Sequence, residues 1–553
     1  MKCGCVYMAS LQRKIVKGRE YWSLVESKRI NGKPTPIVIE YYGNTKKFAE
    51  KLLNGEYNNK ILKSFSHGDT FALYKIVQKL EIEKILDNIF KKRTRSGLKR
   101  SQSIIIAAIQ SACCPGSKNE LFDWIQTTTL PYEMGIKANK LTSQHFWSQM
   151  DDITEEELDK AEDAIVKKIF ELYDFELEKI ALDYTNYFTY IDSSNDRNSI
   201  AKRGKNKQKR NDLRQYSLAL ITTKESGLPL YTHVYEGNVN DQSEFFQFVN
   251  LLKNRIPNYD PKSITLVFDG GSNNKKNFAM LETHYICSFS LSYCKELYEI
   301  DIKDYKELKI NGKSVRNYRI PHEIWGKQRE CILTFSESLL KGQLKELNND
   351  IQRVVNNIEE LNEKLHNPKS RISKSKTNIE AKLNVILCKP HMNAIFKVSP
   401  RGSDSITNIE FSIDEAAKLE IINKYFGKKL IVSDRKEWST FEIIKTYREQ
   451  DCIEKIFRDS KDTEHFSIRP QYHFTDQKIR VHIFSCLLGL TLATILHKDI
   501  LNKGFDISKT QLLNDLRQIR QCFIKDKIGL KVNKTFEEMT ELQSNLWCAL
   551  NKI

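Results

Sequence analysis

Two aspartates stand at the borders of apolar, β-prone runs, where a carboxylate can do chemistry. Asp183 lies in "ALDYTNYF", and Asp269 lies in "LVFDGG", where an apolar run ends beside two glycines. A carboxylate in a buried strand is costly unless it is paired, protonated or bound to a metal. Each aspartate alone is equally well explained as structural. Together, in two strands of one predicted sheet, they indicate a divalent-cation site, and hard oxygen ligands suit Mg²⁺ or Mn²⁺.

A third carboxylate is predicted from the segment "YREQDCIEKIFRDSKD", which begins at Tyr447. If the segment is one helix, Tyr447, Glu454 and Lys461 share a face, and Arg458 lies one turn after Glu454. Glu449 would be about 140° away from Glu454 at 100° per residue. Glu454 is therefore the acid that we expect to point into a site. The alternative is an ordinary surface helix in which Glu454 and Arg458 form an i,i+4 pair.

Three carboxylates can hold two metal ions about 4 Å apart, an arrangement that cuts and joins phosphodiesters. One ion activates a water or a 3′-hydroxyl, and the other stabilises the leaving oxygen. Lys461 and Tyr447 would then hold the neighbouring phosphate. The net charge of +17 also favours a polyanionic partner, with nucleic acid first. A lysine-rich proteome is the alternative explanation of that charge.

The elements that must position these residues divide the 553-residue chain into segments of different character. The pattern of apolar residues changes between strand-like and helical spacing along the chain. We predict a small β-rich N-terminal region at 1–66, with a hairpin at Asn31-Gly32; a helical, DNA-binding region at 67–178; an α/β core at 179–290 and 429–553, the latter ending in helices; and an insertion domain at 291–428, with β pieces and a long helix.

The long helix of the insertion carries a heptad seam. Its apolar residues alternate spacings of four and three and end before Pro368: Leu340, Leu344, Leu347, Ile351, Val354, Ile358, Leu361 and Leu365. Such a seam needs a partner helix. The return segment "KTNIEAKLNVIL" can supply it within the chain, and a second protomer is the alternative. We favour the intramolecular hairpin.

Two basic segments are candidates for contact with DNA phosphates. "AKRGKNKQKRNDLR" (201–214) holds seven basic residues in fourteen, and Lys205, Lys207, Lys209 and Arg210 are its predicted phosphate contacts. "KKRTRSGLKR" holds six in ten between two predicted helices. The second segment is as readily a solvated loop.

Other features place the chain in a broad class. The N-terminus "MKCGCVYMASLQRK" lacks the apolar core of a signal peptide. The longest apolar run, "IFSCLLGLTLATIL", is short for a bilayer and is expected to be a buried helix. None of the twelve cysteines forms a CxxC pair, so reduced thiols are the simplest account. We expect a cytoplasmic protein with no membrane partner.

In order along the chain, these motifs resemble those of IS4-type DDE transposases, especially the IS1634-like group. The family signature is Tyr, two residues, Arg, three residues, Glu, six residues, Lys. Tyr447, Glu454 and Lys461 match it, whereas Gln450 stands where Arg is expected. "DYTNYFTYID" and "LVFDGGSNN" resemble the segments that bear the family's catalytic aspartates, and "IRPQYHFTDQKIRVHIFSCLLGL" resembles the tail after the glutamate.

The resemblance implies an α/β, RNase H-like core, interrupted by the insertion domain, with Asp183, Asp269 and Glu454 as catalytic ligands of two Mg²⁺ or Mn²⁺ ions. It implies a homodimer that binds the terminal inverted repeats of an insertion sequence, cuts with water and joins the 3′-hydroxyl to target DNA. Some relatives form a DNA hairpin, and an insertion-domain tryptophan stacks on a flipped base. Trp325 is a candidate by location, although a buried core tryptophan is the default expectation.

Three other functions stay open at this point. The chain could be another two-metal RNase H-like nuclease, which would cut without joining strands. It could be a catalytically inactive DNA-binding transposase relic, against which the presence of all three acids argues. A scaffold role for the heptad helix is the third.

Overall fold

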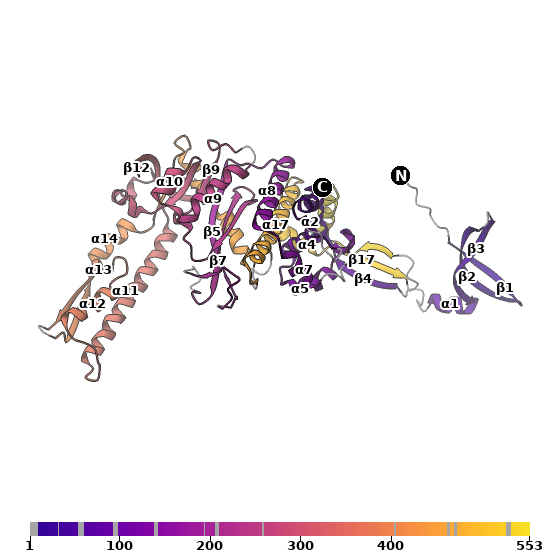
Figure 1. Ribbon diagram of the computed structural model, residues 1–553, viewed down its shortest axis with the longest axis horizontal. Helices are drawn as coiled ribbons and strands as arrows, with labels where there is room; N and C mark the ends of the chain where they lie inside the picture. Colours follow the sequence, from indigo (N-terminus) through magenta and orange to yellow (C-terminus); the bar gives the residue numbers. More distant parts are fainter. Residues whose placement is uncertain are drawn as a thin grey trace.

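The computed structural model describes residues 9–30, 33–53, 60–91, 98–137, 142–192, 194–204, 210–256, 259–402, 405–461, 465–468, 473–526 and 532–552. These residues form a mixed α/β structure (Figure 1). Its described strands make one ten-stranded sheet, two three-stranded sheets and one two-stranded sheet. The sheet of the first three strands lies at one end of the molecule, and a helical arm projects at the other.

The N-terminal sheet is antiparallel and is followed by a short helix. Its elements are β1 (Ala9–Val16), β2 (Arg19–Ile30), β3 (Lys33–Asn44) and α1 (Thr45–Leu53). The β2–β3 ladder closes with Ile30 opposite Lys33, so the chain turns at the predicted hairpin, whose two residues lie outside the described ones. Trp22 stacks on Phe48, with ring centroids 5.8 Å apart, and this contact fixes α1 on the sheet.

One strand of the predicted N-terminal region belongs to the C-terminal part of the chain. β4 (Lys60–Ser66) pairs with β17 (Arg520–Asp526), which also pairs with β18 (Val532–Phe536). The predicted boundary at residue 66 therefore encloses a strand whose partner lies more than 450 residues away along the chain. Strand-like spacing shows that a segment is extended but does not identify its partner.

Residues 68–172 form helices that pack around one long C-terminal helix. They are α2 (Gly68–Lys79), α3 (Ile82–Ile89), α4 (Arg100–Cys113), α5 (Lys118–Gln126), α6 (Leu130–Glu133), α7 (Ser143–Met150) and α8 (Glu155–Leu172). The central helix is α17 (Asp476–Leu501), and α18 (Lys509–Arg517) and α19 (Glu541–Leu550) follow it. Most of the basic stretch between α3 and α4 lies outside the described residues.

α17 is the buried helix that the apolar run predicted, but it is longer than that run. It has 26 residues, and by length and composition it is the one described helix that could cross a membrane. However, 94% of its most apolar window is buried inside the protein. At Gly489 a Cβ atom would lie 2.3 Å from the Ala108 carbonyl oxygen, so the glycine lets α17 and α4 approach closely.

The ten-stranded sheet holds the two predicted aspartates. Its order is β11-β12-β13-β16-β10-β9-β5-β7-β6, and β8 also pairs with β7. The strands are β5 (Lys179–Thr189), β6 (Lys202–Arg203), β7 (Arg214–Thr223), β8 (Pro229–Glu236), β9 (Thr265–Phe268), β10 (His284–Phe289), β11 (Lys306–Ile310), β12 (Lys313–Ile324), β13 (Lys327–Phe335) and β16 (Lys428–Ser433). β9 runs parallel to both β5 and β10, and the other pairs are antiparallel.

Helices connect and cover these strands. α9 (Asp241–Arg255) leads from β8 to β9, and α10 (Lys275–Met280) leads from β9 to β10. Phe245 of α9 and Phe278 of α10 pack on Phe268 of β9. Residue 267 points to the opposite face, where it joins a cluster with Ile443 and Ile444 of α15 (Thr440–Arg448). α16 (Asp451–Asp459) follows α15.

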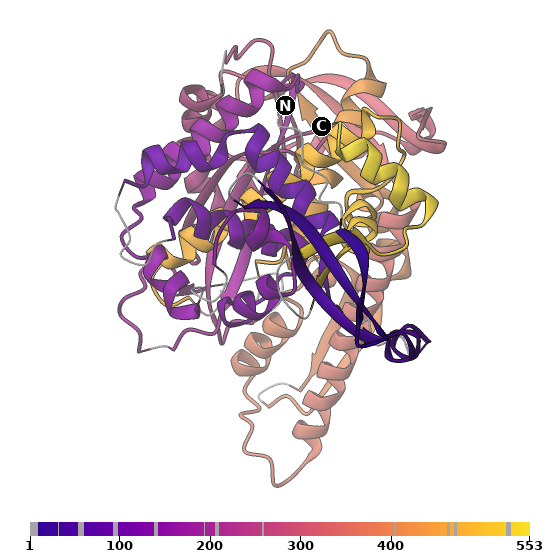
Figure 2. The same ribbon diagram turned by 90° about the vertical axis from the view of Figure 1, so that its right-hand side faces the viewer.

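The predicted insertion domain is only partly separate from the core. β11, β12 and β13 continue the main sheet, because β16 inserts between β10 and β13 and pairs with both. The part that leaves the sheet is the helical arm, residues 337–425 (Figures 1 and 2). It contains α11 (Glu337–His366), α12 (Lys376–Ile386), α13 (Met392–Ile395), β14 (Phe396–Arg401), β15 (Asn408–Ile413) and α14 (Glu415–Tyr425).

The heptad seam of α11 is covered within the chain. Its buried residues from Leu347 to Leu365 form one cluster with Ile379 and Leu383 of α12 and with residues of β15 and α14. The intramolecular partner that we favoured is therefore present. Leu340 and Leu344, at the start of the seam, are only partly buried.

Candidate active site at the ends of β5 and β9

Asp183 and Asp269 lie side by side on one face of the main sheet. In the parallel β5–β9 ladder Leu182 pairs with Phe268, so the next residue of each strand is an aspartate at the same level. Side chains alternate between the faces of a sheet. Asp269 therefore shares the face of residue 267, which packs on α15. Both aspartates line one pocket of about 210 Å³.

Hydrogen bonds favour the ionised form of Asp269. Ser288 of β10 donates to Oδ1 of Asp269, and the Tyr447 hydroxyl donates to the same oxygen over 3.3 Å. Burial alone would raise the pKa of Asp269, but the bonds from Ser288 and the Gly270 backbone, with the charge of Lys429, lower it below its usual value. Burial raises the pKa of Tyr447, so its hydroxyl keeps the proton that it donates.

The predicted lysine also reaches this face. Nζ of Lys461 donates to Oγ1 of Thr185 and lies 5.4 Å from the centre of the Tyr187 ring. Thr185 is two residues beyond Asp183 in β5, so it shares the face of that aspartate. The Asp183 carboxylate accepts the backbone N–H of Tyr184 at 2.8 Å. A cation thus stands within the same pocket as the two carboxylates.

The segment from Tyr447 onward is two helices, so the prediction of one helix was wrong. α15 ends at Arg448 and α16 begins at Asp451. The backbone N–H of Gln450 bonds to the carbonyl of Tyr447, and that of Ile453 bonds to the carbonyl of Gln450, each at 3.1 Å. These i→i+3 bonds tighten the chain. The 100° rule therefore does not relate residues across the break.

Gln450 has a structural role at that break. Its side chain is buried, and its amide donates to the Leu182 carbonyl over 3.5 Å. This contact ties the α15–α16 junction to β5, one residue before Asp183. The residue that departs from the family signature therefore positions the helices over the aspartates. No sequence pattern indicates this role, because a glutamine that becomes buried looks like any other polar residue in an amphipathic pattern.

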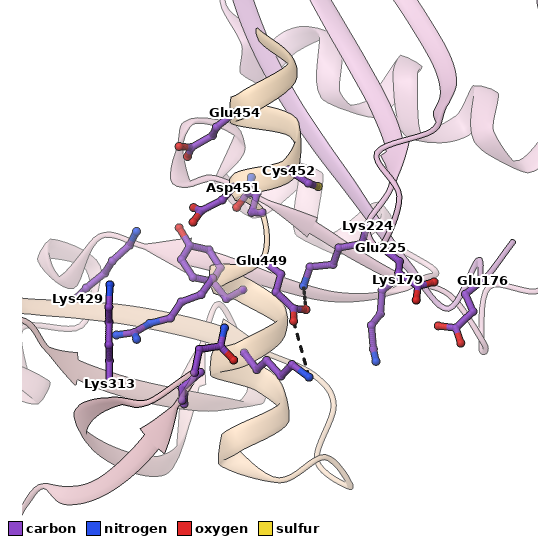
Figure 3. A pocket seen from close by; sticks show the side chains of 16 residues that line it. Glu176, Lys179, Lys224, Glu225, Lys313, Lys429, Glu449, Asp451, Cys452 and Glu454 are labelled. Carbon is purple, nitrogen blue, oxygen red and sulfur yellow. Dashed lines mark ion pairs between the residues drawn. The ribbon is translucent and has the colours of Figure 1, made fainter. Parts of the chain in front are cut away.

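Glu454 is exposed and lines a second, larger cavity of about 840 Å³. In Figure 3, Glu454 and Asp451 point to one side of α16, and Cys452 points to the other. Tyr447 lines this cavity and also bonds to Asp269, so the tyrosine lies between the cavity and the pocket of the two aspartates. Among the described residues no group of three His, Cys, Asp or Glu side chains is placed to hold a metal ion. The structure thus assembles two of the three predicted acids.

Of the other predicted DNA contacts, Arg210 and Arg458 do not line the pocket of the two aspartates. Lys205, Lys207 and Lys209 lie outside the described residues. Arg210 forms a two-pronged pair with Asp212, at 2.9 and 2.8 Å. The Arg458 side chain is 72% exposed and lies 3.7 Å from Asp459, its sequence neighbour. The i,i+4 pair with Glu454, which the alternative of an ordinary surface helix required, is not among the ion pairs of the described residues.

Trp325 sits in the turn between β12 and β13, with a left-handed φ of 55°. Its ring lies edge-on to Phe278 and Phe289, with centroids 5.2 Å apart in each case, and 5.7 Å from Tyr293. Trp325 is half-buried and packs against the main core through these rings, and its stacking on a base stays a prediction. Stacking on a base would require the ring to leave these neighbours.

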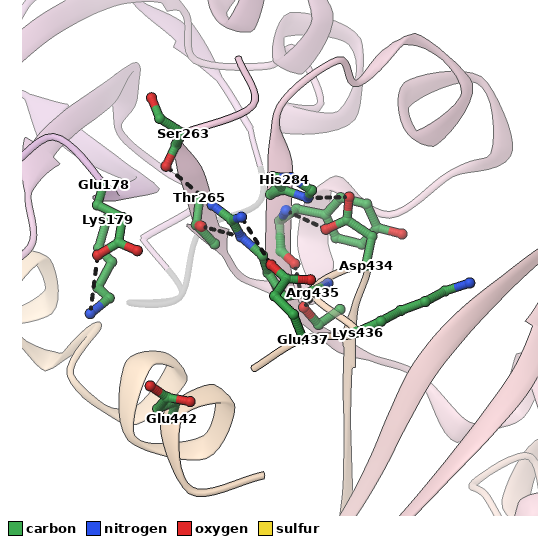
Figure 4. A network of polar contacts seen from close by, with 12 residues as sticks. Glu178, Lys179, Ser263, Thr265, His284, Asp434, Arg435, Lys436, Glu437 and Glu442 are labelled. Carbon is green, nitrogen blue, oxygen red and sulfur yellow. Dashed lines mark hydrogen bonds and ion pairs between the residues drawn. The ribbon is translucent and has the colours of Figure 1, made fainter. Parts of the chain in front are cut away.

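A network at the opposite end of β9 holds the strand in place (Figure 4). Buried Arg435 donates to Oγ1 of Thr265 at 3.0 Å and to the carbonyl of Ser263 at 3.1 Å. Asp434 accepts the backbone N–H of Tyr285 at 2.9 Å and lies 3.0 Å from Nδ1 of His284. The loop after β16 therefore clamps β9 and β10 at one end, while Asp269 extends from the other end of β9.

Comparison with known proteins adds little to this geometry. No family model matches the chain, and no curated protein matches it. Among solved structures the chain is similar to a piggyBac transposase, described in a synaptic complex with hairpin DNA. The identity is 10%, the TM-score is 0.36, and the match covers 81% of this chain and 79% of that one. A TM-score this low assigns neither a fold family nor an activity, and the resemblance to the IS4-type group stays a prediction.

Proposed function

We propose that the chain is a metal-dependent DNA transposase of the DDE type, with Asp183, Asp269 and Glu454 as its catalytic acids. The observation that carries the proposal is the pair of aspartates at the same level of β5 and β9. They lie on the sheet face that α15 covers. The Tyr447 hydroxyl bonds to Asp269, and Lys461 lines the same pocket as both aspartates. Carboxylates at the ends of parallel strands are frequent site residues in α/β proteins.

The strand arrangement supports an RNase H-like core. Three antiparallel strands, β8, β7 and β5, are followed by β9 and β10, which are parallel to β5 and reached through helices. β16 and the strands beyond it extend this unit and connect it to the helical arm.

The donor set fits Mg²⁺ or Mn²⁺ in its chemistry, since both aspartates supply hard carboxylate oxygens. Two bound ions would supply an activated water or 3′-hydroxyl and stabilise the leaving oxygen. Asp183 and Asp269 would hold them, and Glu454 would join from α16 in the adjoining cavity. This requires α16 or the Glu454 side chain to move toward the sheet when DNA binds.

The remaining residues bind and orient the substrate. Lys461 lines the same pocket as Asp183, and its positive charge would attract a phosphate. Tyr447 holds Oδ1 of Asp269 in place, and Lys429 lies 4.6 Å from the centre of the Tyr447 ring, where its charge favours the ionised aspartate. The proposed substrates are the terminal inverted repeats of an insertion sequence and a target DNA, bound by a homodimer in a prokaryotic cytoplasm.

The test is a cleavage and strand-transfer assay with Mn²⁺, on the DNA that flanks the gene, with DNA binding measured in parallel. We expect Glu454→Gln and Asp183→Asn to bind DNA but neither cut nor join it. The matched control is Asp451→Asn, which removes an exposed acid one turn before Glu454, on the same side of α16. It should retain both steps. Loss of activity in Asp451→Asn instead of Glu454→Gln would move the third ligand to Asp451.

The alternatives give different results in the same assay. Cutting without joining would indicate another two-metal nuclease. Binding with no cutting by the wild type would indicate an inactive relic, and the proposal would fail.

A further inference from the structure

The 840 Å³ cavity beside the aspartates is lined by cations from several elements. It lies between the β7–β8 turn, the β11–β12 turn and the α15–α16 junction (Figure 3). Six basic residues line it: Lys179, Lys224, Lys313, Lys429, Lys445 and Arg448. Five acids line it too, among them Glu454 at one end and Glu176 at the other. A cation of this cavity is available to a ligand only if it does not already form a strong ion pair with one of these acids.

Lys224 is the most deeply buried of these cations. The residue is 5% exposed, and among the described residues its Nζ has no hydrogen-bond partner. Its nearest acid is Glu449, whose Oε2 lies 3.4 Å away, and Figure 3 shows the two side chains pointing toward each other. A buried ammonium group without hydrogen bonds is unfavourable. It has three N–H donors available for an anion.

Glu449 is a weak partner for this lysine. Its side chain is 41% exposed, and it also lies 3.8 Å from Nζ of Lys445. Both distances are longer than a charge-assisted hydrogen bond of about 2.8 Å. A partly solvated ion pair of this kind contributes little. The carboxylate thus stands between two lysines, where the oxygens of a bound anion would otherwise lie.

We propose that this cavity binds a phosphodiester group of a DNA strand, held by Lys224 and Lys445, and that Glu449 competes for these lysines until the strand enters. The choice of DNA rests on the function proposed above. The location agrees with it, because Tyr447 lines the cavity and bonds to Asp269. A strand held here would run past the tyrosine toward the two aspartates.

The test measures binding of labelled single-stranded and duplex oligonucleotides by fluorescence anisotropy, over a salt series, in EDTA. Because no divalent cation is present, the result does not depend on catalysis. We expect Lys224→Met to weaken binding about tenfold. The slope of the binding constant against salt concentration, on logarithmic scales, should become shallower by about the amount that one phosphate contact contributes. Glu449→Gln should bind several-fold more tightly than wild type. In the double variant the gain from Glu449→Gln should shrink to the part that comes from release of Lys445, because Lys224 is no longer there to be released.

The matched control is Glu225→Gln, which removes one negative charge from the same cavity without touching the Lys224–Glu449 pair. A gain equal to that of Glu449→Gln would show a general charge effect and overturn the proposal. The proposal also fails if the full gain persists in the Lys224→Met background. Inorganic phosphate, added as a competitor, separates the sources of the anion. If binding of inorganic phosphate depends on Lys224 but Lys224→Met does not change oligonucleotide binding, the cavity is a site for small anions instead.

The two proposals can fail independently. If Glu454→Gln still cuts DNA while Lys224→Met weakens binding as expected, the catalytic assignment is wrong and the strand site stands. If Glu454→Gln is inactive and the Lys224 variants bind like wild type, the strand site is wrong and the catalytic assignment stands.

Discussion

The buried charge of Lys224 should make the protein less stable than a variant with an apolar side chain there. Burial lowers the pKa of Lys224 from 10.5 to about 8, and Glu449 offsets only part of this effect. The unfolded chain therefore binds this proton more tightly than the folded protein does. At pH 7 Lys224 is protonated in both the folded and the unfolded chain, and the difference between its two pKa values destabilises the fold by about 3 kcal/mol. Lys224→Met keeps most of the buried volume and should recover about this amount.

The pH dependence gives the sign of the effect. Because the pKa is lower in the folded protein, the wild type gains stability as the pH rises from about 8 toward 10.5. Between pH 7 and pH 9.5 this gain is about 2 kcal/mol, so the advantage of Lys224→Met should fall to about 1 kcal/mol. Urea unfolding of both proteins at the two pH values measures this difference.

The control for this experiment is Lys445→Met. The Lys445 side chain is 44% exposed, so its removal should change the free energy of unfolding by no more than about 0.5 kcal/mol. If Lys224→Met is no more stable than wild type at pH 7, or if the difference does not narrow at pH 9.5, Lys224 is not an uncompensated buried cation. The cavity would then hold no poorly compensated cation that could attract an anion.

Three further predictions concern the framework that holds the site. Burial lowers the pKa of His67 to about 4, so the fold should lose about 2 kcal/mol from this group between pH 7 and pH 5, and His67→Asn should show a shallower loss in urea unfolding. Gly489→Ala should destabilise the protein by about 1–3 kcal/mol, since its Cβ would meet the backbone of Ala108, and thermal unfolding will measure this. Ile358→Ala removes a fully buried side chain from the helical arm, and we expect a cost of about 2–5 kcal/mol, with faster hydrogen exchange confined to the arm.

Local patterns predicted the elements of this fold better than their partners. The heptad seam and the apolar run of α17 are properties of single segments, and each forms the helix expected of it. The pairing of β4 with β17, and of β16 with both β10 and β13, joins segments far apart in the chain. The apolar pattern of a strand does not identify the strand it pairs with, so these pairings could not be predicted from the sequence.

The candidate site shows the same limit on a smaller scale. Asp183 and Asp269 were predicted to lie together because they occupy matching places in two strands of one sheet, and the β5–β9 ladder places them so. The break at Gln450 was missed because the apolar spacing of Ile453 and Tyr447 fits both a continuous helix and an i→i+3 turn. The i→i+3 backbone bonds show that the chain tightens there, and the bond from the Gln450 amide to the Leu182 carbonyl ties the junction to β5.

The break gives two glutamates of one short segment different surroundings. Glu449 ends α15 and lies between Lys224 and Lys445, whereas Glu454 is an exposed residue of α16. If both were ordinary acids of a solvated helix, the Glu449→Gln and Glu454→Gln variants would have the same effect. The two proposals instead predict opposite results, because they make Glu449 a competitor of the bound DNA and Glu454 a catalytic acid. Glu449→Gln should tighten DNA binding, and Glu454→Gln should leave binding intact and abolish cutting, so the pair of variants separates binding from chemistry within six residues.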